Sequence, residues 1–182
     1  MEIADYIVAD DRQLARLVLG GDTAAFEYLF DRYRDAIHRL FLQRTGNAED
    51  ADDLLQETFI KAYDHIDELL SGKIESTKAW LMRIAVNTCK DTLRSSWMRH
   101  IDNRQEIEAL PLSIASCAEE RLALTPAIMA LAPKHREIVL LYYYQDMSLR
   151  ACAQVLGISA PTATRRLQQA QKKLRIQLEE RG

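Results

Sequence analysis

The apolar residues of this chain recur at intervals of three and four over most of its 182 residues, and this spacing limits the possible folds more than any other feature. One apolar stripe follows Asp22 and consists of Phe26, Leu29, Phe30, Tyr33, Ile37, Leu40 and Phe41. Residues at this spacing share one side of an α-helix. No segment shows the sustained alternation of apolar and polar residues that indicates a strand. The spacing predicts an all-α fold.

Polar residues beside these stripes predict where the helices begin and end. Asp22 follows Gly20 and Gly21, so it is expected to cap the helix that starts there, while the glycines end a shorter one. Asn47, followed by Asp50, is expected to cap a helix through DDLLQETFIKAYDHIDELL. After the polar stretch SGKIESTK, another helix is expected over AWLMRIAVNTCKDTLRSSW.

The regular spacing fades after Trp97, and the chain is expected to divide there. We predict a helical domain over residues 1–96, a linker over residues 97–117 and a second helical domain over residues 118–182. In the second domain a helix is expected to start at Pro133, because proline is tolerated in a first helical turn. A chain of this length can bury two small cores.

The composition also bears on location and chemistry. No apolar run approaches the roughly 20 residues that cross a membrane, and the N-terminus MEIADYIVADD is acidic where a secretory signal would be basic. We therefore expect a cytoplasmic protein without membrane insertion. Cys89, Cys117 and Cys152 include no CxxC pair, so they are expected to be reduced and mostly small core residues. No metal site or cofactor is expected.

The formal net charge of −3 conceals a separation of charge along the chain. Residues 46–75 contain nine acidic side chains and two lysines. Residues 78–104 contain six basic and two acidic side chains, and residues 148–182 contain seven basic and two acidic ones. Two basic segments divided by an acidic one indicate two nucleic-acid contacts and a docking surface for a basic partner, although helical surfaces are also often blocky in charge without any function.

The stretch SLRACAQVLGISAPTATRRLQQAQKKLR, residues 148–175, predicts a helix-turn-helix. Ser148 is expected to cap the first helix, Gly157 to end it and Ser159 to cap the second. A buried stripe of the second helix is expected from Ala163, Leu167, Ala170 and Leu174. The opposite face carries Arg165, Gln168, Gln169 and Lys172. Arginine and glutamine suit base edges in the major groove and lysine suits phosphates, so this second helix is predicted to read DNA.

The same stretch resembles the promoter-reading helix-turn-helix of bacterial sigma factors of the extracytoplasmic function (ECF) group, and ALAPKHREIVLLYYYQDMS resembles the helix that leads into it. Upstream, DADDLLQETFIKAY and AWLMRIAVNTCKDTLR are similar to the two central helices of the N-terminal sigma domain. The resemblance covers roughly residues 10 to 96 and 118 to 176. It implies a factor without catalysis of its own that directs RNA polymerase core to promoters.

The resemblance implies roles for named residues in the N-terminal domain. Asp53, Gln56 and Glu57 are expected to dock on the clamp helices of the largest polymerase subunit. The following helix is expected to read and open the minus-ten element. Its contacts are assigned to Arg83, Asn87, Lys90 and Arg94, where Asn87 matches the asparagine of the family's AxNT stretch and the cations hold phosphates. Trp80 is expected to be a core anchor rather than a stacking platform for a base.

The resemblance assigns the second helix of the helix-turn-helix to the minus-thirty-five element. The predicted contacts are Thr162, Thr164, Arg165, Arg166, Gln168, Gln169 and Lys172. Relatives usually have a basic residue where Thr164 stands and arginines where Gln169 and Gln171 stand, so their promoter sequence does not carry over. The further partners implied are promoter DNA, the polymerase flap region and an anti-sigma factor.

Three other interpretations remain open at this stage. A one-component helix-turn-helix regulator would use residues 1–117 as a sensor or dimerisation domain and bind a palindrome without polymerase. A sigma-like decoy would dock on polymerase or an anti-sigma factor without reading promoters. A helical metalloenzyme would need His38, His65, His100 and His135, which show no HxxxH or HExxH spacing.

Overall fold

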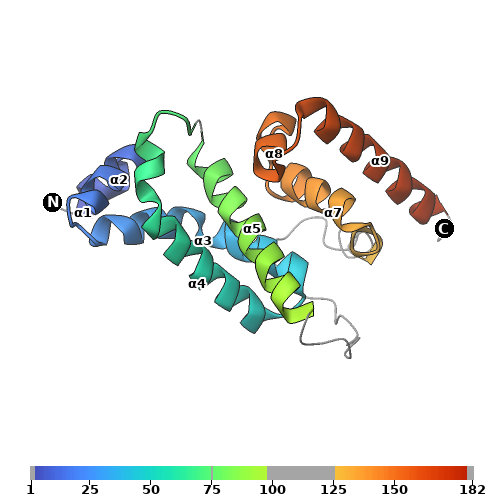
Figure 1. Cartoon of the computed structure of the whole chain (residues 1–182), viewed down its shortest axis with the longest axis horizontal. Helices are drawn as coiled ribbons and strands as arrows, with labels where there is room; N and C mark the ends of the chain where they lie inside the picture. Colours follow the sequence, from blue (N-terminus) through green and yellow to red (C-terminus); the bar gives the residue numbers. More distant parts are fainter. Residues whose placement is uncertain (1–2, 75, 98–125, 180–182) are drawn as a thin grey trace. The chain divides into compact units, whose positions relative to one another are not determined.

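The computed structural model describes residues 3–74, 76–97 and 126–179 and is helical wherever it contains regular secondary structure, which confirms the all-α prediction. The chain divides into two compact units, whose described parts are residues 3–74 with 76–97, and residues 126–179 (Figure 1). Most of the predicted linker, residues 97–117, lies outside the described residues, so the division into residues 1–96, 97–117 and 118–182 stays a prediction. Among the described helices, none has the length and apolar character needed to cross a membrane.

The first unit contains α1 (Ile3–Val8), α2 (Asp11–Leu19), α3 (Ala24–Thr45), α4 (Ala48–Asp64), the 3₁₀-helix η1 (Ile66–Leu70) and α5 (Thr77–Trp97). Helices α3, α4 and α5 pack against one another, and α2 packs on α3 and η1. The apolar stripe of α3 supplies Leu29, Ile37, Leu40 and Phe41 to the core, where each is almost fully buried. The spacing of apolar residues therefore located the core correctly.

The cap of α4 is confirmed, whereas the predicted cap of α3 is wrong. The Asn47 side chain accepts hydrogen bonds from the backbone N–H groups of Glu49 (2.8 Å) and Asp50 (3.3 Å). Helix α3 begins one residue later than expected, after Thr23, which has helical dihedrals and makes no side-chain cap. The carboxylate of Asp22 instead accepts a hydrogen bond of 2.6 Å from the Tyr6 hydroxyl, so it is engaged by α1.

The long helix expected through DDLLQETFIKAYDHIDELL is interrupted at His65, where the backbone leaves the α-helical region. The last turn winds more tightly, as the 3₁₀-helix η1. This change keeps both Ile66 and Leu69 buried against α2. The periodicity alone did not reveal the break, because the apolar positions continue through it.

Arg32 and Asp11 hold the N-terminal helices on α3. The Arg32 guanidinium donates to the Asp11 carboxylate at 2.8 Å and to the Ala9 carbonyl at 2.7 Å. The Tyr33 hydroxyl donates to the other Asp11 oxygen at 2.6 Å. Burial and this carboxylate both raise the pKa of Tyr33, so its hydroxyl stays protonated as a donor.

The described part of the second unit contains a helical segment at residues 126–129, α7 (Pro133–Val139), the π-helix η2 (Leu140–Tyr144), α8 (Leu149–Leu156) and α9 (Ala160–Glu179). Pro133 opens α7 as predicted. Helix α9 packs on both α7 and α8. Its contact stripe contains buried Ala163, Leu167 and Ala170 and half-buried Leu174, as predicted.

Two of the three cysteines can be placed, and both agree with the prediction. Cys89 and Cys152 are free thiols and fully buried, in α5 and α8 respectively. Burial raises the pKa of Cys152 to about 11, so its thiol is protonated at neutral pH. Cys117 lies outside the described residues.

Candidate protein and nucleic-acid interfaces

Helix α4 separates its apolar and acidic residues onto different sides. Its buried side contains Ala51, Leu54, Leu55, Thr58, Phe59 and Ala62. Asp53, Gln56 and Glu57 are all exposed, and their spacing of three and four places them on one stripe of the opposite side. We call this stripe, with Ile60 in the next turn, the docking face. The structure therefore brings together the three residues predicted to bind polymerase.

Ile60 is a member of the docking face that the sequence reasoning missed. It follows Gln56 by four residues and Glu57 by three, and 56% of its surface is exposed. The sequence did contain a signal for this position. Ile60 falls on the side of the helix that carries the acidic residues, not on the side that carries Phe59, so it is an apolar residue out of phase with the buried stripe. Tyr63, one turn further on, is 41% exposed. The docking face thus combines negative charge with apolar surface that would lose its water when a partner binds.

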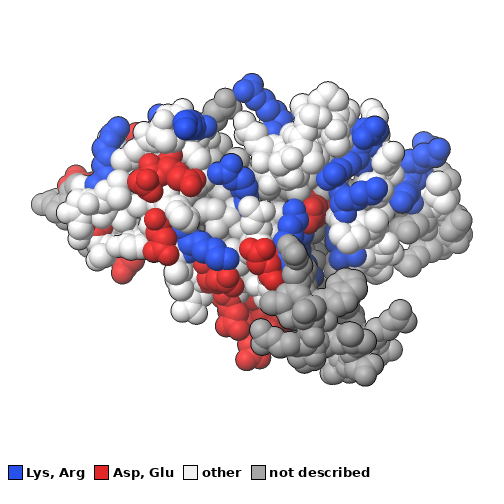
Figure 2. Space-filling model, in the orientation of Figure 1, with Lys and Arg blue, Asp and Glu red and all other residues white. Residues whose placement is uncertain are grey.

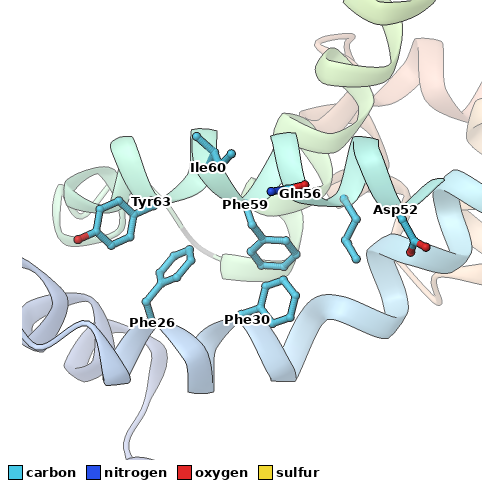
Figure 3. A pocket seen from close by; sticks show the side chains of 8 residues that line it. Phe26, Phe30, Asp52, Gln56, Phe59, Ile60 and Tyr63 are labelled. Carbon is cyan, nitrogen blue, oxygen red and sulfur yellow. The ribbon is translucent and has the colours of Figure 1, made fainter. Parts of the chain in front are cut away.

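An open apolar groove of about 390 Å³ lies between α3 and α4, next to the docking face. Figure 3 shows Phe26 and Phe30 projecting from α3 toward Phe59 of α4, with Tyr63 at one end of the groove and Asp52 at the other. The rings of Phe30 and Phe59 meet at 4.4 Å between centroids, and those of Phe26 and Tyr63 at 5.0 Å, both edge to face. This packing gives the groove a firm apolar floor.

The predicted minus-ten residues also share one side of a helix. Arg83, Asn87 and Lys90 are exposed and lie at spacings of four and three on α5. Arg94 continues the same stripe by its position, and its side chain lies outside what the structure describes. The buried side of α5, which packs against α3 and α4, contains Ala79, Trp80, Leu81, Met82, Ala85, Val86, Thr88 and Cys89. The exposed stripe is therefore held in place by the packing of the other side of the helix.

Two residues near the start of α5 are fixed by one carboxylate. Trp80 is 3% exposed, and its indole Nε1 donates to Glu68 Oε2 at 2.8 Å. The Arg83 guanidinium lies 3.7 Å from the same oxygen, so Arg83 is paired with a residue of η1. About half of the Arg83 side chain nevertheless stays accessible to solvent. The prediction of Trp80 as a core anchor is confirmed. Stacking of a base on this ring would require the helix to open.

Lys61 connects the docking face to α5. Its ammonium lies 2.7 Å from Glu57 Oε1 within α4 and donates to the buried hydroxyl of Thr88 in α5 at 3.3 Å. Thr88 follows Asn87 directly. This bridge joins a residue predicted to touch polymerase to the neighbour of a residue predicted to touch DNA.

The predicted helix-turn-helix is formed by α8 and α9, and its turn has the expected chemistry. Ser148 Oγ accepts from the Ala151 N–H at 3.2 Å, and Gly157 ends α8 in the left-handed region at φ 64°. The Ile158 N–H donates to the Ala153 carbonyl at 3.0 Å, which closes the turn. Ser159 Oγ accepts from the Thr162 N–H at 3.4 Å at the start of α9.

The predicted contacts on α9 differ in how far they are free to meet DNA. Arg165, Gln168 and Lys172 are exposed and lie furthest from the buried stripe. The hydroxyls of Thr162 and Thr164 are engaged within the helix, the first with Ser159 Oγ at 2.8 Å and the second with the Ala160 carbonyl at 3.1 Å.

Two further positions on α9 lie closer to its packed side. Arg166 is half-buried, and Gln169 is exposed but hydrogen-bonded to the adjacent helix α7. The seven predicted residues therefore form a graded surface, with Arg165, Gln168 and Lys172 outermost.

The charges on these faces have opposite sign. Figure 2 shows acidic side chains gathered over α4 and basic side chains over α9. This separation matches the blocks counted in the sequence, and it places the acidic and basic groups on different helices and in different units. A partner with a basic surface and a partner with a phosphate backbone would each meet a complementary face.

The comparisons with known proteins agree with this geometry. A family model for sigma-70 region 2 matches residues 29–99, and one for sigma-70 region 4 matches residues 121–174. The ECF RNA polymerase sigma factor SigL of Mycobacterium tuberculosis is 30% identical over 165 residues, which cover 88% of this chain and 93% of SigL. The chain belongs to the ECF group of RNA polymerase sigma factors.

Other comparisons extend this result across both domains of the sigma factor. SigW of Bacillus subtilis is 30% identical over 172 residues, covering 87% of this chain and 91% of SigW. The solved structure of CnrH in complex with the cytosolic domain of CnrY shares 26% identity and has a TM-score of 0.68, covering 94% of this chain and 99% of CnrH. RpoE of Bartonella quintana, in complex with the anti-sigma factor NepR, has the same fold at 20% identity, with a TM-score of 0.67, covering 85% of this chain and 96% of RpoE.

The family match removes one of the other interpretations. Residues 29–99 are a sigma domain, so they are not the sensor of a one-component regulator. Within the described residues, no group of three potential metal ligands occurs. His135 is buried in α7, His65 is exposed and His38 lies 3.0 Å from Asp52, while His100 is outside the described residues.

Proposed function

We propose that this sigma factor binds polymerase core through the docking face, reads the minus-ten element with the exposed stripe of α5 and reads the minus-thirty-five element with the outer face of α9. One observation supports all three assignments. Among the side chains that the structure describes, those predicted for each contact lie on one side of one helix, and each side has the charge that its partner requires. The nucleotidyl transfer belongs to the polymerase, and the chain works where the polymerase does, in the cytoplasm.

The assigned residues divide by chemistry. Asn87 offers an amide that can pair with the edge of an unstacked base, while Lys90 and Arg83 suit phosphates. On α9, Arg165 and Gln168 suit base edges and Lys172 suits a phosphate. Because the two reading helices belong to separate units of one chain, binding of one element raises the effective concentration of the other reader. Neither reader then needs high affinity alone.

An anti-sigma factor is a further proposed partner. CnrH and RpoE, which share the fold, were solved as complexes with CnrY and with an anti-sigma factor. In this chain the open groove beside the docking face offers apolar surface to such a partner. Occupation of the groove would cover Gln56 at the same time, because Gln56 lines it. The polymerase and the inhibitor would then compete for one surface.

The experiment that tests the proposal adds the purified chain to sigma-free bacterial core polymerase on a library of genomic DNA and sequences the transcript starts. A shared two-part motif upstream of discrete starts is the expected result. Binding to polymerase without specific starts would support the decoy interpretation instead. Failure to bind polymerase at all would overturn the assignment of the docking face.

A further inference from the structure

A buried histidine on α7 touches one of the α9 residues that the sequence predicts to read DNA. His135 is 3% exposed, and its Nε2 lies 3.2 Å from Oε1 of Gln169. Its Nδ1 is also buried and has no hydrogen-bond partner among the residues that the structure describes. His135 and Gln169 are 34 positions apart in the sequence, so only the packing of α7 on α9 brings them together.

The chemistry of this contact fixes the direction of the hydrogen bond. An amide oxygen has no proton, so the imidazole must donate from Nε2. A neutral imidazole that carries its proton on Nε2 has a lone pair on Nδ1, which agrees with the unpartnered Nδ1. His135 therefore acts as a donor and fills one acceptor position of the Gln169 amide.

Gln169 is exposed on the flank of α9 beside Arg165 and Lys172. A free glutamine amide both donates and accepts, and this pair of functions matches adenine, which presents N7 as an acceptor and N6 as a donor. A contact to adenine through both groups requires the amide oxygen and nitrogen of Gln169 to face the base together. An oxygen directed at His135 in α7 cannot do this, so the amide protons of Gln169 remain as the groups that can face DNA. Guanine presents two acceptors, N7 and O6, side by side and fits a group that only donates.

We propose that His135 is a positioning residue that makes Gln169 a donor-only reader, so that Gln169 selects guanine over adenine at one position of the minus-thirty-five element. This inference rests on the proposed function of α9. His135 does not touch DNA in this arrangement, and it acts only through the orientation of the Gln169 amide.

The test uses holoenzyme assembled from core polymerase and each variant, with a promoter library in which every minus-thirty-five position is randomised. Gln169→Ala identifies the position that Gln169 reads. Gln169→Glu keeps an acceptor for His135 but has no proton to donate at neutral pH. His135→Leu removes the donor and fills a similar volume, and His135→Gln restores an N–H donor. Circular dichroism and melting temperature confirm that each variant is folded.

At the position identified by Gln169→Ala, the natural chain should prefer guanine over adenine by about tenfold, the size of one good base contact. Gln169→Glu should abolish this preference although it alters only an exposed side chain. His135→Leu should reduce it to less than about threefold, while His135→Gln should recover most of it. Preferences at the other positions should not change in the His135 variants.

Three results would overturn the inference. The first is an adenine preference at the Gln169 position, or none, while the rest of the element is read. The second is a folded His135→Leu variant with an unchanged guanine preference. The third is an equal loss at every position, which would show a purely structural role for His135. Absence of any upstream preference in the natural chain would instead overturn the proposed function of α9, and the inference with it.

Discussion

Helices α4 and α9 are both amphipathic, but their exposed sides differ in kind. The exposed side of α4 combines Asp53 and Glu57 with the apolar Ile60, beside an apolar groove. The N-terminal half of α9 exposes Arg165 and Gln168 and no large apolar side chain. A protein partner gains from apolar surface that loses its water, whereas DNA is met by donors and positive charge. The difference between the two helices therefore distinguishes the two kinds of partner before any complex is seen.

The largest expected effect comes from reversing charge on the docking face. Asp53→Lys combined with Glu57→Lys should lower affinity for polymerase core at least a hundredfold, because like charges would face each other across the interface. The free energy of unfolding should change little, since both side chains are exposed. Binding to immobilised core polymerase measures the first quantity and urea denaturation the second.

A matched control for this variant is Asp31→Lys combined with Asp35→Lys. These exposed acidic residues on α3 have the same spacing and produce the same change in net charge. The control should keep near-normal affinity apart from a weaker general attraction. Equal losses in the two double variants would show that net charge matters and that α4 has no special role.

Two single substitutions on the outer face of α9 test which of its residues contact bases and which contact phosphates. Arg165→Ala should cost about 1–3 kcal/mol of promoter recognition at one base position if Arg165 reads a base. Lys172→Ala should weaken binding on all sequences alike and reduce its salt dependence, because a phosphate contact carries no sequence information. Affinities of holoenzyme for matched and mismatched promoters at several salt concentrations separate the two. A uniform loss for Arg165→Ala would reassign it to the DNA backbone.

Much of the fold followed from the sequence because the relevant forces act locally. The apolar spacing located the buried stripes of α3 and α9, and the short polar residues Asn47, Ser148 and Ser159 cap the helices expected of them. These features depend on neighbours within one helical turn. The exposed stripes on α4 and α5 followed in the same way, since residues three and four apart share a side.

The features that were missed depend on partners far away in the chain. Asp22 fails as a cap because Tyr6, 16 positions earlier, engages its carboxylate. The oxygen of Gln169 accepts a hydrogen bond from His135 on α7, and Lys61 on α4 donates one to Thr88 on α5. Local propensity has no information about such contacts. The members of the candidate site could therefore be predicted residue by residue from the sequence, while the orientation of their side chains comes from the tertiary structure.

Ile60 tests whether the apolar part of the docking face contributes to binding. Ile60→Ala should weaken polymerase binding by about 1–2 kcal/mol, because most of the apolar surface that a partner would bury is lost. The matched control is Ile7→Ala on α1, where the side chain is 63% exposed and lies outside the docking face. Direct binding to core polymerase measures both. Equal affinities for the two variants would leave only the charges of α4 as the source of its specificity.

The smallest expected effect concerns the turns before α4 and on either side of α8. The turn before α4 places Gly46 in the left-handed region at φ 69°, whereas the turn before α8 places Asp146 there at φ 51°. Glycine adopts this conformation without steric cost, so Asp146→Gly should raise the free energy of unfolding by about 0.5–1 kcal/mol. Gly157→Ala should lower it by about 1 kcal/mol through backbone strain alone, because a Cβ there would meet no atom of the described residues within 4 Å apart from its own chain neighbours. Urea denaturation measures both, and a destabilised Asp146→Gly variant would show that the aspartate side chain itself contributes to the turn.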